Sequence, residues 1–329
     1  MDEIKKPAGK NILITGATGL IGKAIVDFLM GNDTINYDVY AMGRNTRRAS
    51  AHFHQYEDNR HFHFIRHDVT DDLQSDVDFH YIIHAASNAS PAFFSKHPVD
   101  IMRSNFEGTR RLLDYGKSHN MERFLYVSTG EVYGEGDGRI FTEDYQGYVN
   151  INSPRSCYPM AKRATETLCA AYAAQYNIDY VIARPCHTYG AYFTEEDNRV
   201  FAQFIRNVMN NEDIIMKSPG TQYRAWCSVE DCASAIIHIL MRGKNGEAYN
   251  VADSRSCFTI RELAEMIADI AGRKVIMDIP TEEEKNAFNP VTKSLFSTAK
   301  LEALGWKAKG DMRGDIQRII NTLKNTDRQ

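Results

Sequence analysis

Two side chains in the stretch RSCYPMAK, residues 155–162, have the types and the spacing of an acid/base pair. Tyr158 and Lys162 are four residues apart, so on a helix they would lie on one face and could act at one site. Tyrosine ionises near pH ~10, and a lysine ammonium beside it would favour the phenolate and lower its pKa. The alternative is an ordinary helix surface, where such spacing is common. The pair therefore gains weight only if other parts of the chain supply a site around it.

A glycine-rich segment, TGATGLIG, follows the first apolar run of the chain, Asn11–Thr15, and opens a helical pattern. Glycines in this position let the backbone approach a pyrophosphate, and the helix start offers free N–H groups and a favourable dipole. The spacing GxxGxxG differs from the dinucleotide fingerprint GxGxxG by one residue, and turns or tight packing also use glycine. The context between strand and helix favours nucleotide binding, and Lys162 could then hold the nicotinamide ribose. The residues expected to contact the cofactor here are Gly16, Thr18, Gly19, Leu20, Ile21 and Gly22.

Two later segments fall where predicted strands end and agree with a cofactor site. A carboxylate after the third strand could accept a hydrogen bond from an adenine amine, and small residues after the fourth would let a cofactor lie close. The carboxyl ends of parallel strands form the edge where open α/β sheets bind ligands. The residues concerned are Asp68 and Val69 after the third strand and Ala85, Ala86 and Ser87 after the fourth.

A hydroxyl partner for Tyr158 follows the fifth predicted strand. The sequence there is STGEVYG, beginning at Ser128, and it lies on the same edge of the sheet. The hydroxyl of Thr129 could bind the alcohol or ketone oxygen that Tyr158 protonates or deprotonates.

The end of the second strand indicates which dinucleotide fits. An acidic side chain there would hold a free ribose 2′-hydroxyl, but the sequence has Arg44, with Arg47 and Arg48 behind it. An arginine would instead pair with a 2′-phosphate. A solvated basic loop is the alternative, and of the two cofactors we favour NADP over NAD.

Six apolar runs separated by helical patterns imply right-handed βαβ crossovers and a doubly wound parallel Rossmann sheet, an α/β fold. After Arg184 the alternation loosens, and helices are expected near 198–211, 230–242 and 259–271. We expect a dinucleotide-binding domain at residues 8–183 plus about 224–255 and a smaller C-terminal substrate-binding lobe at 184–223 and 256–325. The strands are predicted at 11–15, 38–42, 62–65, 81–84, 124–127 and 180–183.

The composition fits an ordinary soluble globular protein. The chain has 329 residues, 43% of them hydrophobic, and a formal charge of -4 spread over interspersed acids and bases, which argues against nucleic-acid or membrane binding. The six cysteines form no CxxC pair and MDEIKKPAGK has no apolar run, so we expect free thiols and a cytoplasmic location. His61 and His63 alternate as in a half-buried strand, and no metal site is predicted.

TGATGLIG, STGEVYG and YPMAK together resemble the extended short-chain dehydrogenase/reductase family, specifically its nucleotide-sugar epimerases, dehydratases and decarboxylases. The resemblance covers nearly the whole chain. It implies that a tightly bound nicotinamide cofactor oxidises the sugar at C4, with Thr129 as the hydroxyl partner, Tyr158 as the base, Lys162 tuning Tyr158, and Glu131 as a further catalytic residue. It also implies that helices 102–118 and 158–176 pack across a two-fold axis in a homodimer. The further residues that it places near cofactor or sugar nucleotide are Pro185 for the cofactor, and Ser87, Glu131, His187, Arg199, Arg224 and Lys293 for the substrate.

Among these enzymes the chain looks most similar to UDP-glucuronate decarboxylases, through residues 143–150, 153–158 and 197–200. By this resemblance, oxidation at C4 makes a β-keto acid that loses carbon dioxide. The alternatives are an isomerase, namely a C4 epimerase, which needs least beyond Thr129, Tyr158 and Lys162, or another lyase, a 4,6-dehydratase. An NADP-dependent ketosugar reductase and a non-catalytic NADP-sensing regulator are also open.

Three departures from the decarboxylase pattern accompany this resemblance. Gly130 stands where decarboxylases have a serine and dehydratases an aspartate, and His187 replaces an asparagine. The arginine that decarboxylases carry shortly before their LGW-like stretch has no counterpart, and Lys293 could hold a carboxylate only as a point charge.

Overall fold

Seven parallel strands form the central sheet, in the order β10-β6-β5-β4-β1-β2-β3. The computed structural model describes residues 9–31, 37–194, 197–278 and 293–326. The six predicted strands are confirmed to within two residues at each end, and β10 is a strand of this sheet that the sequence reading did not include. The strands are β1 (Asn11–Thr15), β2 (Asp38–Gly43), β3 (Phe62–Arg66), β4 (Tyr81–His84), β5 (Arg123–Val127), β6 (Tyr180–Pro185) and β10 (Glu247–Val251).

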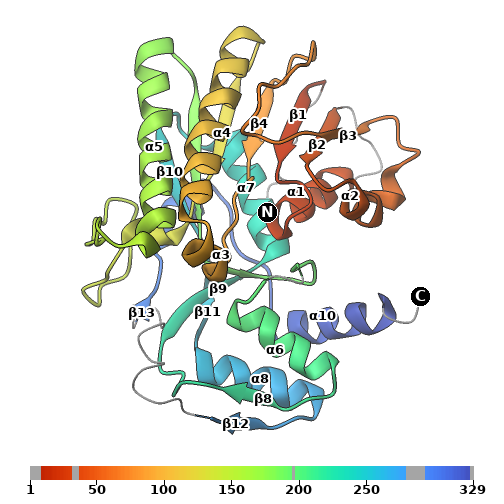
Figure 1. Ribbon diagram of the computed structural model, residues 1–329, viewed down its shortest axis with the longest axis vertical. Coiled ribbons are helices and arrows are strands. Elements are labelled where there is room, and N and C mark those ends of the chain that lie inside the picture. Colours follow the sequence, from red (N-terminus) through yellow and green to blue (C-terminus); the bar gives the residue numbers. More distant parts are fainter. Residues whose placement is uncertain (1–8, 32–36, 195–196, 279–292, 327–329) are drawn as a thin grey trace.

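Helices cover both faces of this sheet, which confirms the doubly wound architecture (Figure 1). Three helices pack their apolar side chains on one face, and two pack on the other, where they lie side by side. Because both faces are covered, most side chains of the strands are apolar. The first face carries α1 (Leu20–Met30), α2 (Thr46–Phe53) and α7 (Val229–Arg242), and the second carries α4 (Pro98–Ser118) and α5 (Cys157–Tyr176).

The order of the strands sets the place of the site. The chain runs outward from β1 to β2 and β3, and then returns to β4, which pairs with the other side of β1. Such a switch point opens a crevice at the carboxyl ends of the two neighbouring strands, where ligands bind in open α/β sheets. The glycine loop follows β1 and the small residues Ala85 and Ala86 follow β4.

A second body of structure with its own apolar core lies beyond this edge, at the bottom of Figure 1. Its main sheet has the order β11-β9-β13, with β7 paired to β9, and β8 and β12 form a separate pair. Residue 8, the predicted start of the dinucleotide-binding domain, and residues 279–292 of the predicted substrate-binding lobe lie outside the described residues. The elements are β7 (His187–Tyr189), α6 (Val200–Met209), β8 (Ile214–Met216), β9 (Tyr223–Ser228), β11 (Asp253–Thr259), α8 (Ile260–Ala271), β12 (Val275–Met277), β13 (Lys293–Ser294) and α10 (Met312–Thr326).

Several short helices complete the chain. Three of them border the site: the 3₁₀ turns η2 and η3, and the helix α3. The short helices are η1 (His54–Tyr56), α3 (Pro91–Lys96), η2 (Gly130–Tyr133), η3 (Pro154–Ser156) and α9 (Ala299–Glu302).

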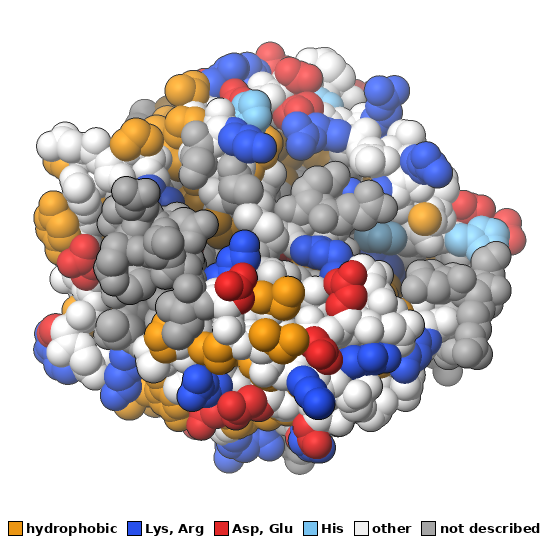
Figure 2. All heavy atoms as spheres, turned by 60° about the horizontal axis from the view of Figure 1, so that its bottom comes forward, with side chains coloured by type: hydrophobic (Ala, Val, Ile, Leu, Met, Phe, Trp, Pro, Cys, Tyr) orange, Lys and Arg blue, Asp and Glu red, His pale blue; other side chains and the backbone are white. Residues whose placement is uncertain are grey.

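Charges of both signs are mixed over the surface seen in Figure 2, where Lys and Arg side chains lie among Asp and Glu side chains. None of the helices within the described residues is sufficiently long and apolar to cross a membrane.

Candidate active site

The glycine loop packs backbone to backbone against the end of β4. Gly16 has a φ of 66°, and a Cβ atom added to it would lie 2.7 Å from Ala85 O and from Ala86 N. A Cβ atom on Gly22 would lie 2.2 Å from Gly16 O. The helix α1 begins after Gly19 with no side-chain cap, so its first N–H groups remain available to an anion. The loop therefore forms a cradle that only glycine allows.

The other residues predicted for the cofactor lie around this cradle. Leu20 and Ile21 form the first turn of α1, and Thr18 sits against Gly43 at the end of β2. Ser87, after β4, has a buried Oγ without a hydrogen-bond partner among the described residues. Val69 lies against Gly108 of α4, and Pro185 ends β6.

Arg44, predicted to bind the 2′-phosphate of the cofactor, and Asp68, predicted to bind its adenine, contact each other. Arg44 Nη1 lies 3.2 Å from Asp68 Oδ2, and the Arg44 side chain is 79% exposed. Burial would raise the pKa of Asp68, but hydrogen bonds from Thr70 and the pair with Arg44 leave it lowered. Asp68 is therefore an anion held between its own turn and Arg44.

Tyr158 is buried at the start of α5, beside Thr129. Its ring stacks on Phe94 of α3, with ring centroids 4.6 Å apart, and only 5% of the residue is exposed. Burial raises the pKa of Tyr158 above its ordinary value, the Glu131 carboxylate raises it further, and a hydrogen bond with Thr129 lowers it. The prediction of a lowered tyrosine pKa is wrong for this structure, because desolvation outweighs the neighbouring cations.

Lys162 lies one helical turn further along the same buried face of α5. Its Nζ donates to Val127 O, at the end of β5, over 2.8 Å, and lies 5.8 Å from the centroid of the Tyr158 ring. Burial lowers the pKa of Lys162 to about 7, opposed in part by Glu166. The bond to Val127 fixes the lysine at the sheet edge that carries Thr129.

Glu131 is paired with Arg155, a residue to which the sequence reading gave no role. Arg155 Nη1 and Nη2 lie 3.2 to 3.3 Å from the Glu131 carboxylate oxygens. The guanidinium also lies over the Phe94 ring, 4.9 Å from its centroid. Arg155 occupies the first position of RSCYPMAK, so its closeness to Tyr158 in the sequence could have indicated that it belongs to the site. Phe94 lies far from Tyr158 in the sequence, and nothing in the sequence indicated its contact.

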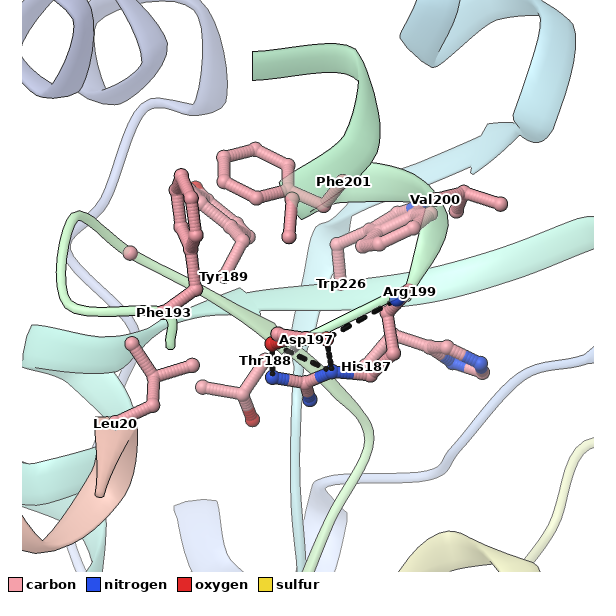
Figure 3. A pocket seen from close by; sticks show the side chains of 12 residues that line it. Leu20, His187, Thr188, Tyr189, Phe193, Asp197, Arg199, Val200, Phe201 and Trp226 are labelled. Carbon is pink, nitrogen blue, oxygen red and sulfur yellow. Dashed lines mark hydrogen bonds and ion pairs between the residues drawn. The ribbon is translucent and has the colours of Figure 1, made fainter. Parts of the chain in front are cut away.

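A pocket lies between β7, α6 and β9, among residues that the sequence predicts for the substrate (Figure 3). His187, Arg199 and Trp226 line it, and Arg199 is fixed by Asp197, whose Oδ2 accepts from Nη2 over 2.6 Å. Burial lowers the pKa of His187 to about 3, with Arg224 and Arg199 adding to the shift, so the imidazole is neutral. The aromatic walls and the fixed arginine suit a ligand with both a flat and an anionic part.

Arg224 and Lys293 lie on neighbouring strands but on opposite sides of the small sheet. Arg224 is 3% exposed, and burial lowers its pKa to about 10, opposed by Glu131. In the β13–β9 register Ser294 pairs with Arg224, and Lys293 pairs with Tyr223. Because side chains alternate along a strand, the exposed Lys293 points away from the face that carries Arg224. The structure therefore does not bring Lys293 together with the other predicted substrate residues.

Gly130 lies between Thr129 and Glu131 with an aromatic ring against it. A Cβ atom on Gly130 would lie 2.4 Å from Phe296 Cζ and 3.5 Å from Pro185 O. Phe296 is 6% exposed and packs among Tyr133 and Phe141. The ring takes the room that a serine or aspartate side chain would need.

A sequence model described as the NAD dependent epimerase/dehydratase family matches residues 12–252. The chain belongs to this family. It is 36% identical over 307 residues to UDP-glucuronic acid decarboxylase 6 of Arabidopsis thaliana, covering 92% of this chain and 85% of that protein. It is 34% identical over 278 residues to UDP-glucuronic acid decarboxylase 1 of Danio rerio, covering 84% of this chain and 64% of that protein. The predicted family is confirmed.

Solved structures of a nucleotide-sugar 4-epimerase and a 4,6-dehydratase have the same fold. UDP-glucuronic acid 4-epimerase from Bacillus cereus, in complex with UDP-glucuronic acid and NAD, superposes with a TM-score of 0.83 at 23% identity, covering 96% of this chain and 99% of that one. The dTDP-glucose 4,6-dehydratase DesIV from Streptomyces venezuelae gives 0.82 at 22% identity, covering 96% and 97%. At this identity the likeness supports the fold alone.

The cradle of this NAD dependent epimerase/dehydratase family member fits a dinucleotide. A pyrophosphate needs close backbone approach and free N–H groups, and Gly16, Gly22 and the uncapped start of α1 provide both. Ser87 Oγ, which has no hydrogen-bond partner within the described part of the chain, adds a polar group at the same edge.

Proposed function

We propose that this chain oxidises a nucleotide sugar at C4 and decarboxylates it, with UDP-glucuronate as the first substrate to test. The observation that carries the proposal is the buried Tyr158 ring, with Lys162 on the same face of α5 fixed to the end of β5, at the sheet edge that carries the glycine loop. The choice of UDP-glucuronate rests on the relatives named UDP-glucuronic acid decarboxylase.

In this proposal Tyr158 is the group that takes the proton from the hydroxyl group on C4. Thr129 binds the C4 oxygen, Lys162 stabilises Tyr158 as a phenolate, and this phenolate accepts the C4 hydroxyl proton and becomes a neutral phenol. NAD or NADP, when bound, would take up the C4 hydride and later return it. The 4-keto acid then loses carbon dioxide, because the ketone accepts the electron pair of the broken carbon–carbon bond. Glu131, whose charge acts on Tyr158, would exchange a proton with C5, the carbon next to C4.

We propose NADP ahead of NAD because of Arg44. The cofactor would be held by Gly16, Gly19 and Gly22 at its pyrophosphate and by Asp68 at its adenine. Arg44, largely exposed and already oriented by Asp68, could pair with a 2′-phosphate. An Arg44→Ala variant is expected to lose NADP affinity and keep NAD affinity, measured by titration of each cofactor.

The nucleotide diphosphate would lie in the second body of structure, between β9 and the predicted substrate-binding lobe at residues 184–223 and 256–325. Arg224 and Arg199 would meet the phosphates, with His187 and Ser87 as neutral partners. The buried environment of Arg224 strengthens any ion pair that it forms.

We also propose a homodimer through α4 and α5, which lie side by side on one face of the sheet. The outer side of α4 exposes Val99, Met102 and Phe106 by 66%, 47% and 40%. Their spacing of three and four residues places them in one stripe. A Phe106→Glu substitution is expected to produce monomers, measured by light scattering.

A C4 epimerase is the second candidate, because Gly130 and Lys293 leave the decarboxylase pattern incomplete. Incubation with UDP-, CDP-, GDP- and dTDP-sugars, with product mass read for each, separates the candidates. Loss of the mass of carbon dioxide from UDP-glucuronate supports decarboxylation, and loss of water supports a dehydratase. An unchanged mass with a new retention time supports an epimerase.

A further inference from the structure

The cationic side chains around Tyr158 differ in their partners and in their burial. Lys162 donates to Val127 O, and Arg199 forms a two-pronged pair with Asp197, whose side chain is 9% exposed. Arg224 is buried on β9. Arg155 differs from Arg199 mainly in its partner, because the Glu131 side chain is 36% exposed and that of Asp197 is 9% exposed, while the two arginines are 41% and 35% exposed.

The pair between Arg155 and Glu131 is open to exchange. Its contacts are at the long end of the hydrogen-bonding range, 3.2 to 3.3 Å, and use only Nη1 and Nη2. In the part of the chain that the structure describes, Nε of Arg155 has no hydrogen bond, so the fork can accept a second carboxylate. Partly exposed ion pairs contribute little to stability, and a ligand can therefore compete for this one.

Phe94 keeps the guanidinium next to the reacting centre. One ring contact joins Phe94 to Arg155 and another joins it to Tyr158, at centroid distances of 4.9 and 4.6 Å. The position of Arg155 is thus defined by an aromatic surface as well as by Glu131. A substrate oxygen bound by Tyr158 and Thr129 would place the adjacent sugar carbons within the reach of Arg155.

We infer that Arg155 recognises the carboxylate of an acidic sugar, shared or exchanged with Glu131. This inference rests on the proposed function, since it assigns the uronate carboxylate within that same site. It fills the gap left by Lys293, which points to the other side of the small sheet, and by Gly130, which has no side chain. Arg155 would then be the residue that distinguishes a uronate from the neutral hexose.

The test compares the dissociation constants of UDP-glucuronate and UDP-glucose for the wild type, Arg155→Gln and Arg155→Lys. The wild type is expected to prefer the uronate. Arg155→Gln should weaken uronate binding by about 10- to 100-fold, as for a lost hydrogen bond to a charged group. Its UDP-glucose binding should stay unchanged, which also shows that the variant is folded. Arg155→Lys should retain part of the preference, because it keeps the charge but not the fork.

Arg139→Gln is the matched control. Arg139 is likewise paired with a carboxylate, that of Asp137, and lies over an aromatic ring, that of Tyr145, but it is 75% exposed. Its removal should leave both dissociation constants unchanged. The inference is overturned if the wild type shows no preference for the uronate, or if Arg155→Gln weakens both ligands equally or neither. These constants do not depend on turnover, so an absence of carbon dioxide release would count against the proposed function alone.

Discussion

The two sides of this site are built from different parts of the chain. On the cofactor side the shape is made by backbone, because Gly16 and Gly22 leave no room for any side chain against β4 and the loop itself. On the sugar side it is made by side chains: Glu131, Arg155 and Phe296 come from segments far apart in sequence. A site made by backbone is encoded in local spacing, whereas a site made by side chains depends on the packing of the whole fold.

The largest expected effect is on the chemistry that joins the two sides. Tyr158→Phe removes the proton acceptor while keeping the ring that stacks on Phe94. We expect a loss in kcat of about 10²- to 10⁴-fold, as is typical for a general acid/base, with little change in cofactor affinity. Steady-state kinetics and cofactor titration check this. Full activity in the variant would remove Tyr158 from the mechanism.

The backbone-built side is tested with two glycines of the same conformation. Gly16 and Gly272 have φ values of 66° and 65°, but only at Gly16 would a Cβ atom meet backbone. Gly272→Ala should cost about 1–2 kcal/mol in the free energy of unfolding, from left-handed strain alone. Gly16→Ala should add an overpacking cost of about 1–3 kcal/mol and weaken cofactor binding. Equal losses in both variants, measured by denaturant unfolding, would contradict the cradle.

The side-chain-built side is tested at Gly130 and Phe296. Gly130→Ser should destabilise the protein by about 1–3 kcal/mol, because its Cβ would meet a ring held in the core. Phe296→Leu removes the ring tip, so the double variant should be less destabilised than the sum of the single ones. Additive losses in a double-mutant cycle would show that the two positions do not compete for space.

The last expected effect concerns the dependence of stability on pH. The folded-state pKa of Lys162 is about 7, below its ordinary value of about 10.5, so between these values the unfolded chain binds the extra proton. The contribution of Lys162 to stability is therefore most unfavourable below pH 7 and improves as the pH rises toward 10. Unfolding free energies at pH 7 and pH 9 should rise more steeply in the wild type than in Lys162→Met. Parallel profiles would mean that Lys162 is not desolvated.

The sequence predicted what local patterns determine. Apolar runs located six strands, and the glycines and the Tyr158–Lys162 spacing located the reacting edge, because each depends on residues close together in the chain. The strand β10 was missed, since it joins the sheet only through its pairing with β6.

The remaining features depend on contacts between distant segments. The Glu131–Arg155 pair, the Phe94 stack and the ring of Phe296 beside Gly130 exist only once the chain is folded. The raised pKa of Tyr158 likewise follows from burial, which the helical spacing to Lys162 does not reveal.

The central claim, oxidation at C4 followed by loss of carbon dioxide, is tested most directly with UDP-glucuronate carrying deuterium at C4. The account predicts a product that has lost carbon dioxide and kept the deuterium at C4, because the same hydride leaves and returns while Tyr158 handles only the hydroxyl proton. A product without the deuterium, or a uronate recovered unchanged with the cofactor present, would contradict it.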